Sequence, residues 1–206
     1  MQYLFIKIHK IIQYEATRRK LTNGDNTAII IVSALAGEKR KHMIILGIDP
    51  GLALMGYGII ETNGHQHKLL GYGVIETKAH TPTPQRLRAL QLGVRDLITI
   101  YKPDDIAFEE LFFARNVTTG LTVGAARGAA IIAAAEYTEN LYEYTPMQIK
   151  QAVVGYGRAE KAQVQQMVKM LLNMKELPKP DDAADGIAVA ITHAHTAHSK
   201  ELFRMK

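Results

Sequence analysis

The sequence predicts an α/β protein built on a mixed five-stranded sheet, in which a three-strand antiparallel meander is joined to two parallel strands, with helices on both faces. Three short apolar runs come first, at residues 43–49, 56–62 and 69–77. Asn63-Gly64 lies between the second and third runs, and this dipeptide is among the strongest hairpin signals. Two later apolar runs alternate with segments of helical spacing, as expected for parallel βα units.

The first strand, MIILGID (43–49), is apolar and rich in residues that favour strands, and Pro50-Gly51 stops it at once. GYGIIET (56–62) and LLGYGVIET (69–77) have the same character and flank the Asn-Gly turn. Three consecutive strands joined in this way predict an antiparallel meander.

The segment 84–101 is predicted to be a helix because its apolar side chains recur at helical intervals, at Leu87, Leu90, Val94, Leu97, Ile98 and Tyr101. A fourth strand is expected at 105–108, ending in Glu109-Glu110, and a fifth at 141–144. The other predicted helices span residues 117–137, 145–153, 160–172 and 181–197. Together these elements give helices for both faces of the sheet.

Composition excludes several classes of protein. The 206 residues include no cysteine, so disulfides, cysteine-based zinc sites and a thiol nucleophile are absent, and a cytoplasmic location is expected. No apolar run reaches the roughly 18–20 residues that span a bilayer. The net charge is +5, but residues 1–42 hold eight basic and three acidic side chains, which leaves 17 of each in the rest. Bulk charge therefore does not argue that the main domain binds a polyanion.

A polar, mostly basic stretch, GEKRKH (37–42), marks a boundary before the regular pattern begins at Met43. We predict a basic extension at 1–42, either a weakly structured arm or the product of a start site assigned too far upstream. The main domain is expected at 43–198, followed by a C-terminal tail at 199–206.

Four carboxylates occur where the predicted elements begin or end. Asp49 ends the first strand, Glu109 ends the fourth, and Asp182 and Asp185 open the last helix, where a spacing of three places them on one face. If the first and fourth strands are parallel neighbours, all four meet in one region, where they would repel and several would titrate high. A pair of Mg²⁺ ions would resolve this conflict and could act on a phosphodiester.

Each of these residues also has a simpler interpretation. Asp49 before Pro-Gly could only start a turn, Asp182 and Asp185 could complement the helix dipole, and Glu109 could lie in a solvated strand end. The combination in this order of elements is what favours a metal site.

Five motifs carry a resemblance to a known family: GIDPG, FEELFFARN, GAARGAAIIAAA, QIKQAVVGYGRAEKAQV and DDAADGIAVAITHAH. In this order they resemble the RuvC family of Holliday junction resolvases over about residues 43–198. The resemblance implies a ribonuclease H-like fold and a Mg²⁺-dependent endonuclease, with two ions in each site and Mn²⁺ as an alternative. It also implies a homodimer that nicks a four-way DNA junction symmetrically, and the branch-migration proteins RuvA and RuvB as partners.

Residue by residue, the resemblance assigns metal binding to Asp49, Glu109, Asp182 and Asp185. It implies that Phe112 meets unstacked bases at the crossover, and that Lys150 and Lys161 lie near the scissile phosphate. Arg115, beside that aromatic pair, would suit phosphate contact. Core packing is the alternative for one of Phe112 and Phe113, and a solvated helix surface is the alternative for the lysines.

Other features have weaker interpretations. Gly120, Gly124 and Gly128 line one face of the helix at 117–137, which would suit packing against the sheet. The resemblance implies that this helix also builds the dimer interface, and we expect both uses, on different faces. His193, His195 and His198 are expected to be mostly polar surface, with His193 near the metal shell as an option.

Three rival functions stay open at this point. They are an actin-like phosphate-binding ATPase or sugar kinase, a ribonuclease H-like nuclease that acts on RNA, and a junction-binding protein without activity.

Overall fold

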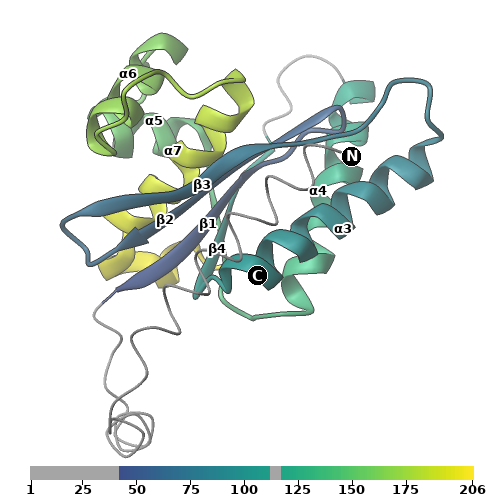
Figure 1. Ribbon diagram of the computed structural model, residues 1–206, viewed down its shortest axis with the longest axis horizontal. Helices are drawn as coiled ribbons and strands as arrows, with labels where there is room; N and C mark the ends of the chain where they lie inside the picture. The colour runs from purple at the N-terminus through teal and green to yellow at the C-terminus, as the bar shows by residue number, and fades with distance from the viewer. Residues whose placement is uncertain (1–41, 112–116) are drawn as a thin grey trace, which may run out of the picture. The chain divides into compact units, whose positions relative to one another are not determined.

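A computed structural model of the protein describes residues 42–111 and 117–206. Its strands form one sheet in the order β3-β2-β1-β4-β5 (Figure 1). The strands are β1 (Met43–Asp49), β2 (Leu54–Thr62), β3 (His67–Glu76), β4 (Asp105–Glu109) and β5 (Leu141–Tyr144). The helices are α3 (Thr83–Tyr101), α4 (Val117–Ala135), α5 (Pro146–Val154), α6 (Lys161–Leu171), α7 (Asp181–His195) and the 3-10 helix η1 (Ala197–Phe203). Within these described ranges no helix is both long and apolar enough to cross a membrane.

The meander turns at Asn63-Gly64, as predicted. Gly64 has a φ of 92°, a left-handed conformation that glycine adopts readily. The backbone N–H groups of His65 and Gln66 donate to Asn63 Oδ1 at 3.0 and 2.9 Å. This turn sets the antiparallel register in which Thr62 faces His67.

The two remaining strands are parallel to β1. Ile48 of β1 pairs with Phe108 of β4, and Glu109 of β4 pairs with Tyr144 of β5. The carboxyl ends of β1, β4 and β5 therefore lie at the same edge of the sheet. The prediction that the first and fourth strands are parallel neighbours is confirmed.

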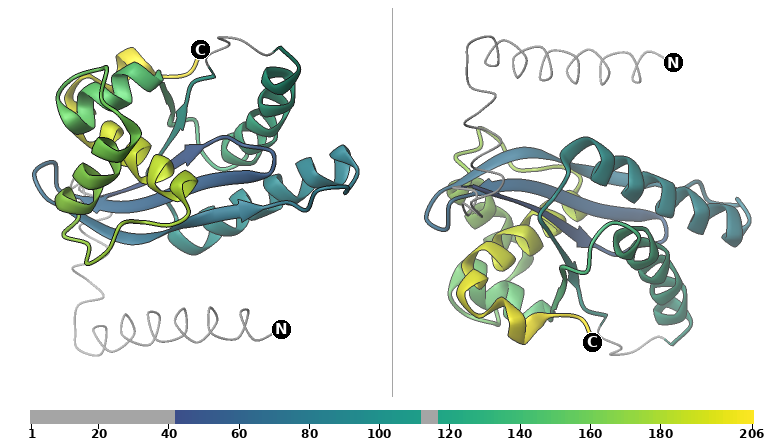
Figure 2. Two further views of the ribbon diagram at one scale, coloured as in Figure 1. Left: turned by 90° about the horizontal axis from the view of Figure 1, so that it is seen from above. Right: turned by 90° about the horizontal axis from the view of Figure 1, so that it is seen from below.

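Helices cover both faces of the sheet, as predicted (Figure 2). Successive side chains of a strand point to opposite faces. Leu46 and Ile48 accordingly belong to the core beneath α3 and α4, whereas Ile45 and Ala107 belong to the core beneath α5, α6 and α7. Each strand of the centre thus supplies side chains to two separate cores.

Helix α7 packs against β1 and β2 through glycine. A Cβ placed on Gly47 would lie 2.4 Å from the backbone nitrogen of Ala190, and one on Gly58 would lie 2.4 Å from Cα of Ile187. Real Cβ atoms do not approach backbone so closely, so only glycine permits this contact. Strand glycines therefore decide how near the helix comes to the sheet.

The chain continues after α7 along β5. Helix α7 ends at His195, two residues before the end predicted at 197, and the N–H of Thr196 donates to the carbonyl of Thr192. Arg204 then forms a β-bridge with Tyr142, and the N–H of Met205 donates to the carbonyl of Leu141 at 3.0 Å. Residues near the C-terminus, taken as a tail from the sequence, thus pack on the edge strand.

Candidate active site

Asp49 and Glu109 lie at the same edge of the sheet. They directly follow Ile48 and Phe108, which pair across the parallel strands β1 and β4. Because side chains alternate along a strand, Asp49 points to the same face as Ile45, which is buried beneath α7. Both carboxylates are half-buried there, at the point where the strands give way to loops.

Helix α7 brings its first turn to this point. Asp49 pairs with Gly56 of β2, and a Cβ on Gly56 would lie 1.8 Å from the carbonyl oxygen of Asp182. No side chain fits in that gap, so the start of α7 lies against the β2 backbone beside Asp49. Asp185 follows on the same side of the helix. The four carboxylates singled out in the sequence therefore converge at one end of the sheet.

The carboxylates perturb one another electrostatically. Burial, followed by the charges of Glu109, Asp185 and Asp182, raises the pKa of Asp49 to about 8, against the opposing effect of Lys161. Burial and the charge of Asp185 raise the pKa of Glu109 to about 7. Burial also raises the pKa of Asp185. Mutual elevation of this kind is the signature of like charges gathered in a partly desolvated place.

Two lysines border the group. Lys161 Nζ lies 2.9 Å from Asp185 Oδ2 and 3.8 Å from Asp181 Oδ2. Lys150 is near enough to Glu109 to lower its pKa, as Lys161 also does. Asp181, the residue before Asp182, thus contacts the same ammonium group. Two cations facing this many carboxylates leave a local excess of negative charge.

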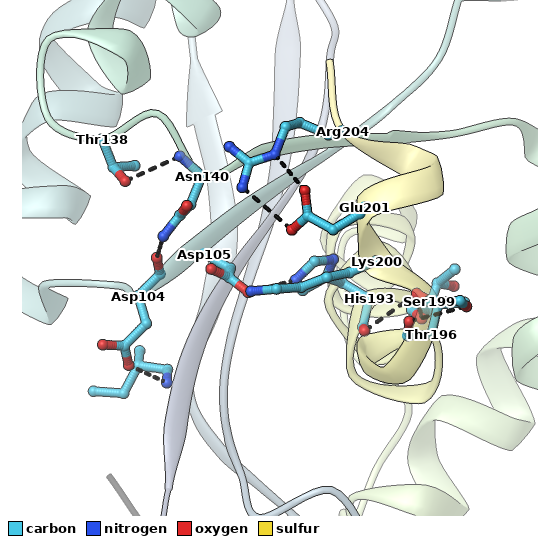
Figure 3. A network of polar contacts seen from close by, with 12 residues as sticks. Asp104, Asp105, Thr138, Asn140, His193, Thr196, Ser199, Lys200, Glu201 and Arg204 are labelled. Atoms are coloured by element: carbon cyan, nitrogen blue, oxygen red, sulfur yellow. Dashed lines mark hydrogen bonds and ion pairs between the residues drawn. The ribbon is translucent and has the colours of Figure 1, made fainter. Parts of the chain in front are cut away.

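His193 is not the polar surface residue that the sequence suggested, because it is fully buried. Its Nε2 lies 2.9 Å from Asp105 Oδ2, and its Nδ1 lies 2.8 Å from the hydroxyl of Tyr144. Lys200 Nζ donates to the same Asp105 oxygen at 2.7 Å. Figure 3 shows Asp105 together with His193 and Lys200, which join α7 and η1 to the start of β4, the end of that strand away from Glu109. His195 and His198 are exposed, as expected.

The model of the family described as Crossover junction endodeoxyribonuclease RuvC matches residues 45–193, a stretch that runs from β1 into the last turn of α7 and includes Asp49, Glu109, Asp182 and Asp185. The chain belongs to the RuvC family. The match favours the resolvase interpretation of the sequence over the actin-like and RNA-directed alternatives.

Relatives within the RuvC family are similar along their whole length. The crossover junction endodeoxyribonuclease RuvC of Alkaliphilus metalliredigens is 56% identical over 164 residues, 80% of this chain and 100% of the relative. A solved Thermus thermophilus RuvC in complex with a Holliday junction substrate has a TM-score of 0.72 at 37% identity, covering 75% of this chain and 94% of that one. The yeast mitochondrial resolvase Ydc2, at 15% identity and a TM-score of 0.56, shares the fold. The predicted ribonuclease H-like α/β fold is confirmed.

The donor set of this RuvC-family site fits Mg²⁺, which prefers oxygen ligands. In the described ranges no three Asp, Glu or His side chains are arranged so that they could hold a metal ion by themselves. Asp185 instead turns one oxygen to Lys161. This arrangement is compatible with Mg²⁺, because that ion is usually held by one or two carboxylates together with water and substrate phosphates. The raised pKa values of Asp49 and Glu109 are a further sign that a bound cation would stabilise this group of carboxylates.

The predicted DNA-contact residues Phe112 and Arg115 lie outside the described residues, and their roles stay predictions. The sequence analysis did not single out two further residues, one beside the site and one at the far end of β4. Gly56 shows as a glycine inside an apolar strand, a recognised sign of close backbone approach. Asp105 shows as a charged residue at the start of a buried strand, a sign that a partner is needed.

Proposed function

We propose that the protein is a structure-selective endonuclease that resolves four-way (Holliday) DNA junctions in recombination and repair, by Mg²⁺-dependent hydrolysis of two symmetrically placed phosphodiesters. The observation that carries this proposal is the group formed by Asp49, Glu109, Asp182 and Asp185 at one end of the sheet, in which burial and neighbouring charges raise the pKa values of Asp49, Glu109 and Asp185. Similarity to a RuvC solved with a Holliday junction supports the choice of substrate.

Asp49 and an aspartate of α7 would hold one metal ion, and Glu109 would help to hold a second. Bound Mg²⁺ supplies an activated water and stabilises charge on the leaving 3′ oxygen. Lys150 and Lys161 stand at the rim of the carboxylate group, where their ammonium charges offset the charge of a phosphate under attack. The expected products are nicked duplexes with 5′-phosphate and 3′-hydroxyl ends.

We further propose that α4 forms the interface of a homodimer, which would give one active site for each of two strands. Leu121 and Ile132 of α4 are 68% and 56% exposed. A Cβ on Gly128 would have nothing within 4 Å, so this part of the helix has room for a close neighbour. Exposed apolar side chains around a small residue favour helix–helix contact. Light scattering should give a dimer mass for the wild type and a monomer mass for Ile132→Glu.

We also propose RuvA and RuvB as partners and a cytoplasmic location. Residues 1–42 would contribute to the attraction of phosphates. These proposals rest on the resemblance and on the charge of the extension. Intact-mass measurement of the native protein would decide whether residues 1–42 are made.

The decisive experiment compares a synthetic four-way junction with a linear duplex of the same arm sequence, each with Mg²⁺, with Mn²⁺ and with EDTA. The proposal expects paired nicks in opposite strands of the junction, only with metal, and little cutting of the duplex. Structure-selective binding without metal-dependent nicking would instead support an inert junction-binding protein. Equal cutting of an RNA-containing substrate would support the RNA-directed alternative.

A further inference from the structure

A cleft of about 490 Å³ opens beside the carboxylate group, between the turn after β1, the start of α3 and the first half of α4. Its lining includes Leu52, Leu54, Arg86, Val123 and Asp182. Asp182 belongs to the proposed metal site, so the cleft leads directly out of that site. Neither lysine of the rim lines it.

Arg86 is held in this cleft through buried Thr77. The Nε–H of Arg86 donates to Thr77 Oγ1 at 2.8 Å, and that hydroxyl donates to the carbonyl of Leu52 at 2.6 Å. The backbone N–H of Thr77 donates to the carbonyl of Ala53 at 2.9 Å. These bonds tie the arginine to the loop that follows Asp49, so its place relative to the carboxylates is fixed.

Among the described residues, no carboxylate neighbour neutralises the charge of Arg86. Within the part of the chain that the structure describes, no carboxylate comes within 4.0 Å of its guanidinium nitrogens. The bond to Thr77 uses the Nε–H and leaves the two terminal amino groups to present a planar pair of donors. Such a pair matches two oxygens of a phosphate, a geometry that lysine cannot reproduce.

Cations on three different elements therefore lie around the carboxylate group and the cleft that leads from it. Lys150 and Lys161 border the carboxylates from α5 and α6, and Arg86 of α3 lines the cleft that Asp182 also lines. A nucleic-acid strand has a phosphate at every nucleotide, so a strand centred on the carboxylates would present its flanking phosphates to these cations.

We propose that the cleft is a second phosphate site, in which Arg86 binds a backbone phosphate that flanks the one being cut. This inference rests on the proposed nuclease function. Binding the flanking phosphate would position the scissile bond over the carboxylates, and it would add one ionic contact to the junction complex. Arg86 is thus assigned as a positioning residue and is no part of the metal site itself.

The first test measures junction binding in EDTA, so that metal and cleavage play no part. Each phosphate contact contributes about 0.9 to the slope of log K against log salt. Arg86→Ala should weaken binding and lower that slope by about 0.9. Arg86→Lys should keep most of the slope but lose cleavage rate, because the charge remains and the paired donors do not. Arg88→Ala, an exposed arginine of the same helix, is the control and should leave the slope unchanged.

The second test replaces single phosphates of the cut strand with uncharged methylphosphonates. In the wild type, one position next to the scissile phosphate should slow cleavage, and in Arg86→Ala the same replacement should have no additional effect. The inference is overturned if Arg86→Ala retains the wild-type slope, if Arg88→Ala lowers it equally, or if the two proteins respond alike at every position. A base-binding cleft would respond to an abasic nucleotide and would overturn it too. Failure of the wild type to cut junctions with any metal would instead defeat the proposed function.

Discussion

The two ends of β4 each carry a carboxylate on the side of the sheet covered by α7, and the protein treats the two in opposite ways. At the start of the strand, burial opposes ionisation of Asp105, but hydrogen bonds from His193 and Lys200 outweigh it and hold the pKa of Asp105 below its ordinary value. At the end of the strand, burial and like charges raise the pKa of Glu109 to about 7 and that of Asp49 to about 8.

The contrast shows that this chain can satisfy a buried carboxylate when the carboxylate serves the fold. Asp105 has an imidazole and an ammonium within 2.9 Å. The acidic group at the opposite end has four carboxylates, and only two lysines, Lys150 and Lys161, lie near enough to offset their charge. An uncompensated group of charges costs stability, so its presence points to a partner that arrives from outside the chain. The predictions below test that difference, beginning with the largest effect.

Asp49→Asn should reduce junction cleavage at least about 10³-fold. Loss of one preorganised charge-stabilising group already costs about 10²–10³-fold, and this residue would in addition hold the metal. Junction binding in EDTA should persist. Gel-based cleavage and binding assays measure both quantities, with the exposed Asp96→Asn as control. Wild-type cutting by Asp49→Asn would refute the assignment of the site.

Asp105→Asn should act on the fold and not on the chemistry. It removes the carboxylate from a buried pair, which typically lowers the free energy of unfolding by about 3 kcal/mol. Urea denaturation measures the loss, and the exposed Glu201→Ala serves as control. Asp49→Asn in the same metal-free assay should be as stable as the wild type or more so. If both substitutions destabilise equally, the two ends of β4 do not differ as argued here.

The pH dependence should have opposite signs at the two ends. Asp49 and Glu109 have folded-state pKa values of about 8 and 7, above those of unfolded carboxyls. The metal-free folded protein therefore binds more protons than the unfolded chain between about pH 4 and 8, and their effect lowers stability as pH rises through this window. The lowered pKa of Asp105 stabilises the fold above the ordinary aspartate range and ceases to do so as pH falls through it.

Urea denaturation of the wild type and Asp49→Asn in EDTA, from pH 5 to 8.5, measures this effect. The stability difference should move in favour of the variant by up to about 1.4 kcal/mol per pH unit, the limit for one titrating group. Saturating Mg²⁺ should stabilise the wild type and reverse the trend. Parallel curves for the two proteins would mean that Asp49 ionises normally.

Lys161→Ala should have the smallest effect, a roughly tenfold loss of cleavage rate, because its side chain is 52% exposed and partly screened by water. The free energy of unfolding should change little, because a bound metal ion can replace the Lys161 ammonium as the partner of Asp185. Single-turnover rates at saturating metal measure the change, and the exposed Lys175→Ala is the matched control. A loss as large as that of Asp49→Asn would give Lys161 a direct role in the chemistry.

Sequence alone was sufficient for the parts that depend on local pattern. The apolar runs, the Asn63-Gly64 turn and the helical spacing of 84–101 fixed the class, the five strands and the parallel pairing of β1 with β4. The pairing in turn placed Asp49 and Glu109 at one edge, since carboxyl ends of parallel strands coincide.

The tertiary structure decided what depends on distances between remote residues. Gly56 admits the backbone of Asp182 only because α7 crosses β2 at that residue. His193 is buried because Asp105 and Tyr144 meet it across 88 and 49 residues of chain, which no helical spacing reveals. The sequence predicted that several carboxylates would titrate high, but only the folded structure decided which ones, because a pKa is set by burial and by neighbouring charges, and both exist only once the chain has folded.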